Sequence, residues 1–173
     1  AALDGLRGEP GYFTETFCVE SRFIHPRNGE RVDAIRRVLE RDWAESPLFP
    51  ILLTSLVEAA DRVDSTTGLQ MAYLKSWAPR SYEDLTLRVP DLLPGSGRTV
   101  VGDAAVTVGE VPRVDLAYLD PPYNQHSYFA NYHVWETLMR WDAPETYGVA
   151  CKRIDCRSTK SAFNSKRLAW PAL

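Results

Sequence analysis

The sequence of 173 residues has little of what marks secreted, membrane or metal-binding proteins. Its three cysteines are too few and odd in number for a disulfide framework. No apolar stretch is long enough for a membrane span or a secretory signal. Cys151 and Cys156, taken with His126 or His133, match no common zinc spacing. We therefore expect a cytoplasmic protein with free cysteines, no membrane segment and no metal site.

The sequence also has no excess of positive charge. It contains 20 Lys and Arg and 23 Asp and Glu, which gives a net charge of −3. Affinity for nucleic acid depends on cations at phosphates, so this balance excludes a uniformly basic binding surface. Any such contact must be local. Three basic patches are candidates: Arg31/Arg36/Arg37/Arg41, Lys75/Arg80, and Lys152/Arg153/Arg157/Lys160/Lys166/Arg167. The last is the densest, and a solvated charged face explains it as well as a phosphate site does.

The sequence contains no internal repeat and does not begin with Met. Its length and its 45% apolar content fit one globular domain of ordinary composition. Because the chain starts within a pattern, at Ala1-Ala2-Leu3, we expect it to be a fragment of a longer protein.

Helical periodicity dominates the first half of the chain. Apolar residues recur at helical spacing from Asn28 to about Arg41, and a second helix is expected from Ser46, as N-cap, to about Val63. A shorter third helix is expected over 69–77. Residues 1–27 carry several glycines and prolines and predict irregular structure, with a short helix near Phe17.

The second half changes to extended patterns. Two short strands are expected over 85–89 and 98–103, with a turn at Gly95-Ser96-Gly97 between them. The apolar run 114–119 predicts a buried parallel strand. A crossover helix is then expected over 128–141, with Tyr132, Trp135, Leu138 and Met139 on its apolar face. Together these elements predict an α/β fold.

The most specific motif is Asp120-Pro121-Pro122-Tyr123, directly after the strand at 114–119. Two prolines remove two backbone donors and fix φ, so the chain must leave the sheet at this point. In open α/β sheets, ligands bind beyond the carboxyl ends of the strands, which makes this loop a candidate catalytic site.

The residue types of this loop suit an exocyclic amino group. The Asp120 carboxylate and the Pro121 carbonyl, held by Pro122, can accept its two N–H groups and so free the lone pair of its nitrogen. Tyr123 offers a ring on which a base extracted from a duplex can stack. The carboxylate and the ring also favour the positive charge that develops on the nitrogen during transfer.

The loop and the residues that follow it, through Leu138, resemble the D12 class of DNA adenine-N6 methyltransferases. Weaker similarity is spread over 13–18, 28–36, 58–63 and 163–167. The resemblance implies S-adenosylmethionine as cofactor and double-stranded DNA with a flipped adenine as substrate. It also implies a fragment of a Rossmann-like sheet over 85–173, preceded by a mainly helical target-recognition region over 1–84.

The resemblance also implies roles for further residues. Asp103 and Ala104, together with Asp120, would bind the cofactor, although Asp103 equally fits a turn at the end of a strand. The residues implied to contact DNA are Arg62, Lys75, Asn164, Lys166 and Arg167. The Phe-x-Gly-x-Gly cofactor motif of the family is absent, which we expect to lie upstream of Ala1. Methylation of RNA or another amine, and a non-catalytic remnant that binds nucleic acid, stay open as alternatives.

Overall fold

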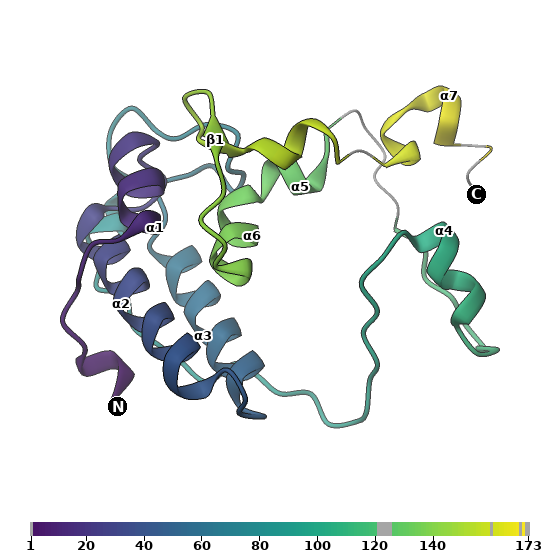
Figure 1. Ribbon diagram of the computed structural model, residues 1–173, viewed down its shortest axis with the longest axis horizontal. Coiled ribbons are helices and arrows are strands. Elements are labelled where there is room, and N and C mark those ends of the chain that lie inside the picture. The colour runs from purple at the N-terminus through teal and green to yellow at the C-terminus, as the bar shows by residue number, and fades with distance from the viewer. Residues whose placement is uncertain (1, 121–125, 160, 170, 172–173) are drawn as a thin grey trace.

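The computed structural model describes residues 2–120, 126–159, 161–169 and 171 (Figure 1). The α-helices within these ranges are α1 (Tyr12–Thr14), α2 (Pro26–Trp43), α3 (Phe49–Arg62), α4 (Ala104–Thr107), α5 (Tyr128–Asn131), α6 (His133–Arg140) and α7 (Lys166–Ala169). A π-helix covers Glu15–Glu20, and 3-10 turns cover Leu3–Gly5, Pro79–Tyr82, Val108–Glu110, Ile154–Arg157 and Ala162–Asn164. No helix within the described ranges combines the length and apolarity that a bilayer crossing requires.

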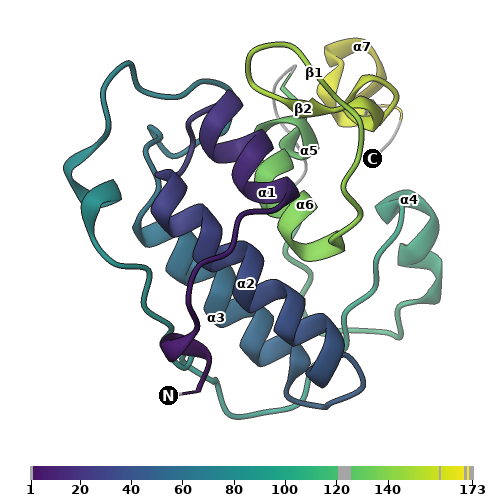
Figure 2. The same cartoon turned by 60° about the vertical axis from the view of Figure 1, so that its left-hand side comes forward.

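Helices α2 and α3 lie side by side at the centre of a helical body, with α1 against α2 and α6 against α3 (Figures 1 and 2). The apolar stripe of α2 is fully buried at Val32, Ile35 and Leu39. Leu56 on α3 and Leu138 on α6 close the core from the other side. Burial of each such side chain contributes about 1.5–3 kcal/mol, so these helices stabilise one another mainly through this core.

The two long helices expected in the first half are confirmed, with shifted starts. Helix α2 begins at Pro26, because the His25 side chain accepts a hydrogen bond from the Arg27 N–H at 3.4 Å and caps the helix. Helix α3 begins at Phe49 and not at Ser46. The Ser46 hydroxyl accepts from the Leu48 N–H at 3.2 Å and its carbonyl accepts from Phe49, so this segment forms a turn before the helix.

The prediction of a helix over 69–77 is wrong. Residues 66–73 form a hairpin instead, which takes up the first part of that segment. Thr66 and Tyr73 form an antiparallel bridge, and the Thr66 hydroxyl accepts from the Gly68 N–H at 3.0 Å. That side-chain bond offers the backbone a turn in place of a helix. Gly68 has a φ of +94°, a conformation that glycine adopts at little cost.

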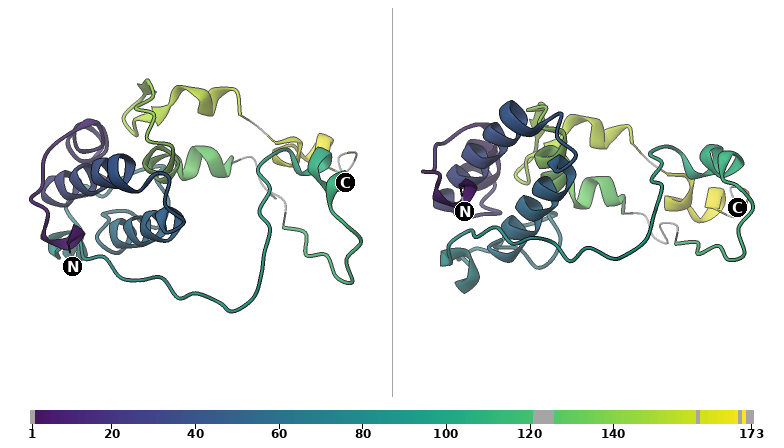
Figure 3. Two further views of the ribbon diagram at one scale, coloured as in Figure 1. Left: turned by 60° about the horizontal axis from the view of Figure 1, so that its bottom comes forward. Right: turned by 90° about the horizontal axis from the view of Figure 1, so that it is seen from below.

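The strands expected over 85–89, 98–103 and 114–119 do not form within the described ranges. Residues 85–88 run along the helical body, where the Leu85 N–H donates to the Asn28 side chain at 3.1 Å and the Arg88 carbonyl accepts from the Ser55 hydroxyl at 2.6 Å. The segments 98–103 and 114–119 lie on a long excursion that carries α4 (Figure 3). Leu85 is buried, but Val101 and Leu116 expose their side chains. A strand needs a partner to pair its N–H and C=O groups, and the described part of the chain supplies none for these segments.

The described sheet is therefore small. Strand β1 (Thr146–Tyr147) pairs antiparallel with β2 (Lys152–Arg153), with Thr146 opposite Arg153. Gly148 has a φ of +68° in the turn between them. The Rossmann-like sheet of the predicted fold class is not seen among the described residues, and the division into 1–84 and 85–173 stays a prediction.

The helix expected over 128–141 is confirmed in part, as two helices. Tyr132, with a φ of −121°, separates α5 from α6. Leu138 is buried as expected, and Trp135 is half-buried. Tyr132 and Met139 are exposed instead of buried. The break turns α6, so that His133, Val134 and Thr137 occupy the buried face.

Candidate functional site

The predicted catalytic loop is described only at Asp120, which is exposed at the end of the excursion. Pro121, Pro122 and Tyr123 lie outside the described residues. The chain is described again from His126, and α5 follows almost at once at Tyr128. The two acceptors expected for an amino group, the Asp120 carboxylate and the Pro121 carbonyl, thus stay a prediction. A helix after the loop was also expected, and α5 is found there.

The predicted cofactor residues Asp103 and Ala104 lie at the start of α4 and not at the end of a strand. The Asp103 carbonyl accepts from the Val106 N–H at 3.0 Å and from the Thr107 N–H at 2.9 Å. Both predicted residues are exposed. This segment places the Asp103 carboxylate next to the Ala104 N–H, at the first turn of α4. An acceptor beside a donor is the pattern that the edge of an adenine ring requires.

Asn164 is brought close to the catalytic segment. Its side-chain amide donates to the His126 carbonyl at 3.0 Å, and its oxygen accepts from the Ser161 N–H at 3.1 Å. The predicted nucleic-acid residues Lys166 and Arg167 follow on α7, where Arg167 is exposed. The structure therefore joins the 161–169 segment to the segment directly after the predicted loop.

Arg62 lies at the end of α3 and lines an open cavity of about 580 Å³. One of its guanidinium nitrogens donates to the Thr86 carbonyl at 2.9 Å. The cavity is lined by Asp61, Arg62, Asp64, Thr66, Thr67, Gly68 and Arg80. Lys75 is exposed on the segment after the hairpin, outside this lining, and its carbonyl accepts from Arg22 at 3.2 Å.

Arg80 has a role that sequence analysis missed. Its guanidinium pairs with the nearly fully buried Asp64 carboxylate, with an Nε–Oδ1 distance of 3.0 Å, and also donates to the Thr66 carbonyl at 3.0 Å. This pairing fixes Arg80 at the same cavity as Arg62. The sequence indicated a basic patch at Lys75 and Arg80, but no local pattern shows that Asp64 is buried.

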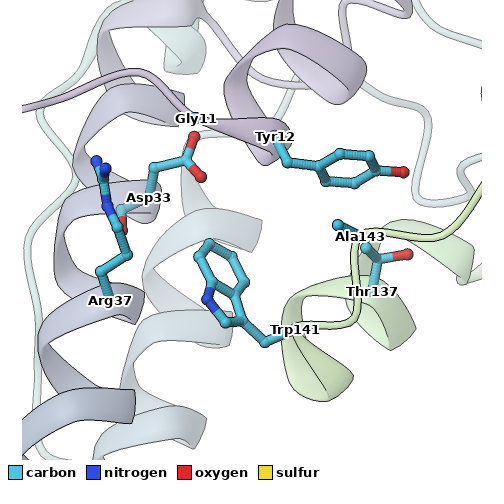
Figure 4. Close-up of a pocket in the computed structure, with 7 residues that line it drawn as sticks. All are labelled: Gly11, Tyr12, Asp33, Arg37, Thr137, Trp141 and Ala143. Atoms are coloured by element: carbon cyan, nitrogen blue, oxygen red, sulfur yellow. The ribbon is translucent and has the colours of Figure 1, made fainter.

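A second cavity of about 260 Å³ lies between the N-terminal segment, α2 and the end of α6 (Figure 4). It is lined by Gly11, Tyr12, Asp33, Arg37, Thr137, Trp141 and Ala143, of which Arg37 belongs to a candidate basic patch and the others were not singled out by the sequence. The Asp33 carboxylate accepts from the Thr14 N–H at 2.8 Å and its hydroxyl at 2.6 Å. The Tyr12 hydroxyl donates to the Pro144 carbonyl at 2.5 Å. These polar groups are thus already engaged in holding the N-terminal segment to the body.

Across the described ranges, no group of three or more His, Cys, Asp or Glu side chains is arranged to hold a metal ion. The cysteines described are free and buried, and burial raises the pKa of the Cys18 thiol well above its ordinary value. Neutral, buried thiols are poor metal ligands and poor nucleophiles.

Comparison with known proteins gives a match over nearly the whole chain. Residues 3–167 match the sequence profile of a family described as D12 class N6 adenine-specific DNA methyltransferase. Type II methyltransferase M.FokI of Planomicrobium okeanokoites is 34% identical over 84% of this chain and 25% of its own length. Modification methylase StsI of Streptococcus sanguinis is 32% identical over 94% of this chain and 26% of its own length. Type II methyltransferase M.NlaIII of Neisseria lactamica is 30% identical over 81% of this chain and 45% of its own length.

The chain spans only about a quarter of the length of the first two relatives. No solved structure matches this chain.

Proposed function

Because this chain belongs to the D12 class of N6 adenine-specific DNA methyltransferases, we propose that the protein carrying it transfers a methyl group to the N6 nitrogen of adenine in double-stranded DNA. The match over residues 3–167 is the observation that carries the proposal. Since the relatives are type II and modification methylases, we propose a restriction–modification role for this protein as well.

The proposed chemistry centres on Asp120-Pro121-Pro122-Tyr123. The Asp120 carboxylate accepts one N–H of the adenine amino group and the Pro121 carbonyl accepts the other, which directs the nitrogen lone pair away from the ring. Tyr123 stacks on the flipped base and returns part of the lost stacking energy, about 1–3 kcal/mol. No strong general base is required, because the methylated nitrogen becomes acidic and loses its proton readily.

S-adenosylmethionine would supply the electrophilic methyl group. The acceptor and donor at Asp103 and Ala104 suit the edge of its adenine ring, so these residues fit a role in holding it. Asp120 would lie on the methyl side of the same pocket.

Nucleic-acid contact would be local. Arg62 and Arg80 share a cavity with the Thr67 hydroxyl, and these donors suit a phosphate. Asp61 and Asp64 line the same cavity, and Asp64 is neutralised by its ion pair with Arg80 and accepts from the Thr66 hydroxyl at 2.5 Å. Lys75 and the 164–167 segment, with Asn164, Lys166 and Arg167, are the other proposed contacts. Their separation from Arg62 suits a duplex that spans the helical body and the C-terminal segment.

The exposed excursion supports a proposal for the fold of the intact protein. Val101, Leu116 and Leu119 carry strand-type patterns and expose their side chains. We propose that 98–103 and 114–119 pair within the Rossmann-like sheet of the intact protein, of which this chain is a part. Residues 1–84 would then form its target-recognition region.

Transfer of labelled methyl groups from S-adenosylmethionine by the full-length protein tests the proposal. The substrates are duplex DNA, the same duplex with its adenines replaced by N6-methyladenine, and RNA of the same sequence. Labelling of the first duplex alone is the expected result. Labelling of RNA instead would favour the RNA methyltransferase alternative, and labelling of nothing would favour the remnant.

A further inference from the structure

Gln70 is a buried amide at the hairpin over 66–73, and its hydrogen bonds leave the hairpin for another part of the fold. Its backbone N–H donates to the Asn131 carbonyl at 2.8 Å. With the amide oriented to satisfy its neighbours, the side-chain nitrogen donates to the same carbonyl at 2.9 Å and the oxygen accepts from Trp135 Nε1 at 2.9 Å. Gln70 is 1% exposed, so water cannot reach its amide. Loss of these hydrogen bonds would leave buried polar atoms without a partner, which is destabilising.

These bonds join the hairpin to both short helices that follow the proposed catalytic loop. Asn131 is the last residue of α5, and Trp135 lies on α6. Phe23 adds a packed contact, because its ring lies 5.8 Å from the Tyr73 ring of the hairpin and 5.7 Å from the His133 ring of α6. A displacement of the hairpin therefore has to displace α5 and α6 or break a buried network.

The other side of the hairpin lines the cavity with the two arginines. Thr66, Thr67 and Gly68 line it together with Arg62 and Arg80. Thr67 and Gly68 are exposed, whereas Gln70, two residues further on, is buried against Asn131. One short segment thus has one end at a candidate phosphate site and the other at the helix that begins just after the proposed methyl-transfer loop.

We infer that Gln70 is a positioning residue that couples DNA contact at the hairpin to the placement of α5. The inference rests on the proposed function and deepens it. Gln70 is too buried to touch DNA, and it acts through Asn131 and Trp135. When the hairpin engages the duplex, the amide network holds α5, and hence the start of the segment that follows the catalytic loop, in one position.

Two substitutions in the full-length protein separate coupling from folding. Gln70→Leu removes both side-chain bonds, and Gln70→Glu keeps the acceptor for Trp135 Nε1 but loses the donor to Asn131. Val63→Ala is the control, since Val63 is buried just after α3 and its N–H donates back into α3, to the Ala60 carbonyl at 3.2 Å. The measurements are kcat and KM for duplex DNA, thermal midpoint, and hydrogen exchange of the 128–140 segment with and without DNA.

We expect Gln70→Leu to lower kcat roughly tenfold, with a change in KM for DNA below about twofold, and Gln70→Glu to lie between it and the wild type. DNA should slow hydrogen exchange over 128–140 in the wild type but not in Gln70→Leu. Combining Gln70→Leu with Trp135→Phe should add less than the sum of the two single effects, because both break one network.

Equal losses of kcat in Val63→Ala and Gln70→Leu at equal thermal midpoints would overturn the inference, because the role of Gln70 would then be stability alone. Retained protection of 128–140 by DNA in Gln70→Leu would overturn it as well. A wild-type protein that labels no DNA would overturn the proposed function together with this inference. An active wild type with unaffected variants would overturn this inference alone.

Discussion

Arg153 and Asp142 form a bidentate ion pair, with both guanidinium Nη atoms 2.7 Å from the carboxylate oxygens. Arg153 is almost fully buried on β2, and Asp142 lies just after α6. Arg153 also donates to Asp155 at 3.1 and 3.0 Å. The short sheet is thereby fixed to the end of α6, although it has only two strands.

We predict that Arg153→Leu lowers the free energy of unfolding by about 2 kcal/mol, the range for lost hydrogen bonds to charged groups. The cost stays below that of a fully buried pair because Asp142 and Asp155 are more than a third exposed and can be hydrated. Arg157→Leu is the control, since Arg157 is exposed and makes a ring contact with Tyr147. Chemical denaturation should show a loss below about 1 kcal/mol for the control. Equal losses would contradict the role of the ion pair.

The same pair predicts a loss of stability in acid. Hydrogen bonds from Arg153 lower the pKa of Asp142 below its ordinary 3.8. A carboxyl group with a lowered folded pKa stabilises the fold above its unfolded pKa, and this contribution is lost as pH falls through the folded value. The stability difference between wild type and Asp142→Asn should therefore be constant above about pH 5 and shrink below pH 3.8.

His133 should make stability depend on pH in a higher range. Burial lowers its pKa from 6.5 to about 4 and outweighs the opposite effect of hydrogen bonds to the Ala150 carbonyl at 2.8 Å and the Ala130 carbonyl at 3.2 Å. The unfolded chain therefore binds a proton between these pH values that the folded chain does not bind. Stability is fully present above pH 6.5 and falls as pH drops toward 4, by at most about 3 kcal/mol.

Denaturant unfolding of the wild type and His133→Gln across this pH range is the measurement. The difference between the two curves isolates His133 from the carboxylates that titrate nearby. His25→Gln is the comparison, because burial also lowers the pKa of the half-buried His25, but less than that of His133, so its pH slope should change less. An identical pH slope in the wild type and His133→Gln would show that His133 is not held neutral by the fold.

Gly29 shows why one helical position requires glycine. A Cβ at Gly29 would lie 2.3 Å from Cys18 Sγ, although alanine favours a helix by about 1 kcal/mol. We expect the clash to outweigh propensity, so Gly29→Ala should destabilise the fold by about 1–3 kcal/mol in thermal or chemical unfolding. Adding Cys18→Ala removes the sulfur and should recover part of the loss. A double variant no more stable than the single one would argue against this contact.

The helices could be predicted from sequence because their determinants are local. Val32, Ile35 and Leu39 repeat at the helical period and are all buried. The predicted strands do not form among the described residues. The segments 98–103 and 114–119 carry a strand pattern, but a strand also needs a neighbouring strand with which to pair, and no local pattern shows one. The helix predicted over 69–77 does not form, because a side-chain hydrogen bond of Thr66 and the positive φ of Gly68 favour a turn just before it.

The candidate site was predictable only where a motif carries it. Asp120 is predicted by the motif and stays a prediction, whereas the ion pair of Arg80 and the hydrogen bonds of Gln70 are seen only in the folded chain. No spacing in the sequence connects Gln70 with Asn131, since the two lie on segments that meet only in the folded chain.

Arg62 should contribute to DNA affinity through phosphate. We expect Arg62→Ala in the full-length protein to weaken binding about equally for all sequences and to reduce the slope of log K against log salt by about 1. Arg27→Ala is the matched control, because Arg27 belongs to none of the candidate basic patches, is exposed on α2 and pairs with Asp84 at 3.2 Å. Fluorescence anisotropy at several salt concentrations measures both slopes. A sequence-dependent loss in Arg62→Ala would indicate a base contact instead.

Asp120 and Tyr123 should differ in what their loss costs. Asp120→Ala removes an acceptor that acts on the reacting nitrogen, so the full-length variant should lose at least about a hundredfold in kcat while it still binds S-adenosylmethionine. Tyr123→Ala removes stacking worth about 1–3 kcal/mol, so its loss should be smaller and should appear partly in the affinity for DNA. Single-turnover methylation and calorimetric cofactor binding measure the two effects. Asp103→Ala is the complementary variant, because a cofactor-binding role predicts weaker S-adenosylmethionine binding. If Asp120→Ala keeps wild-type turnover, the acceptor role is wrong, and if Tyr123→Ala loses as much as Asp120→Ala, the ring also acts in the chemical step.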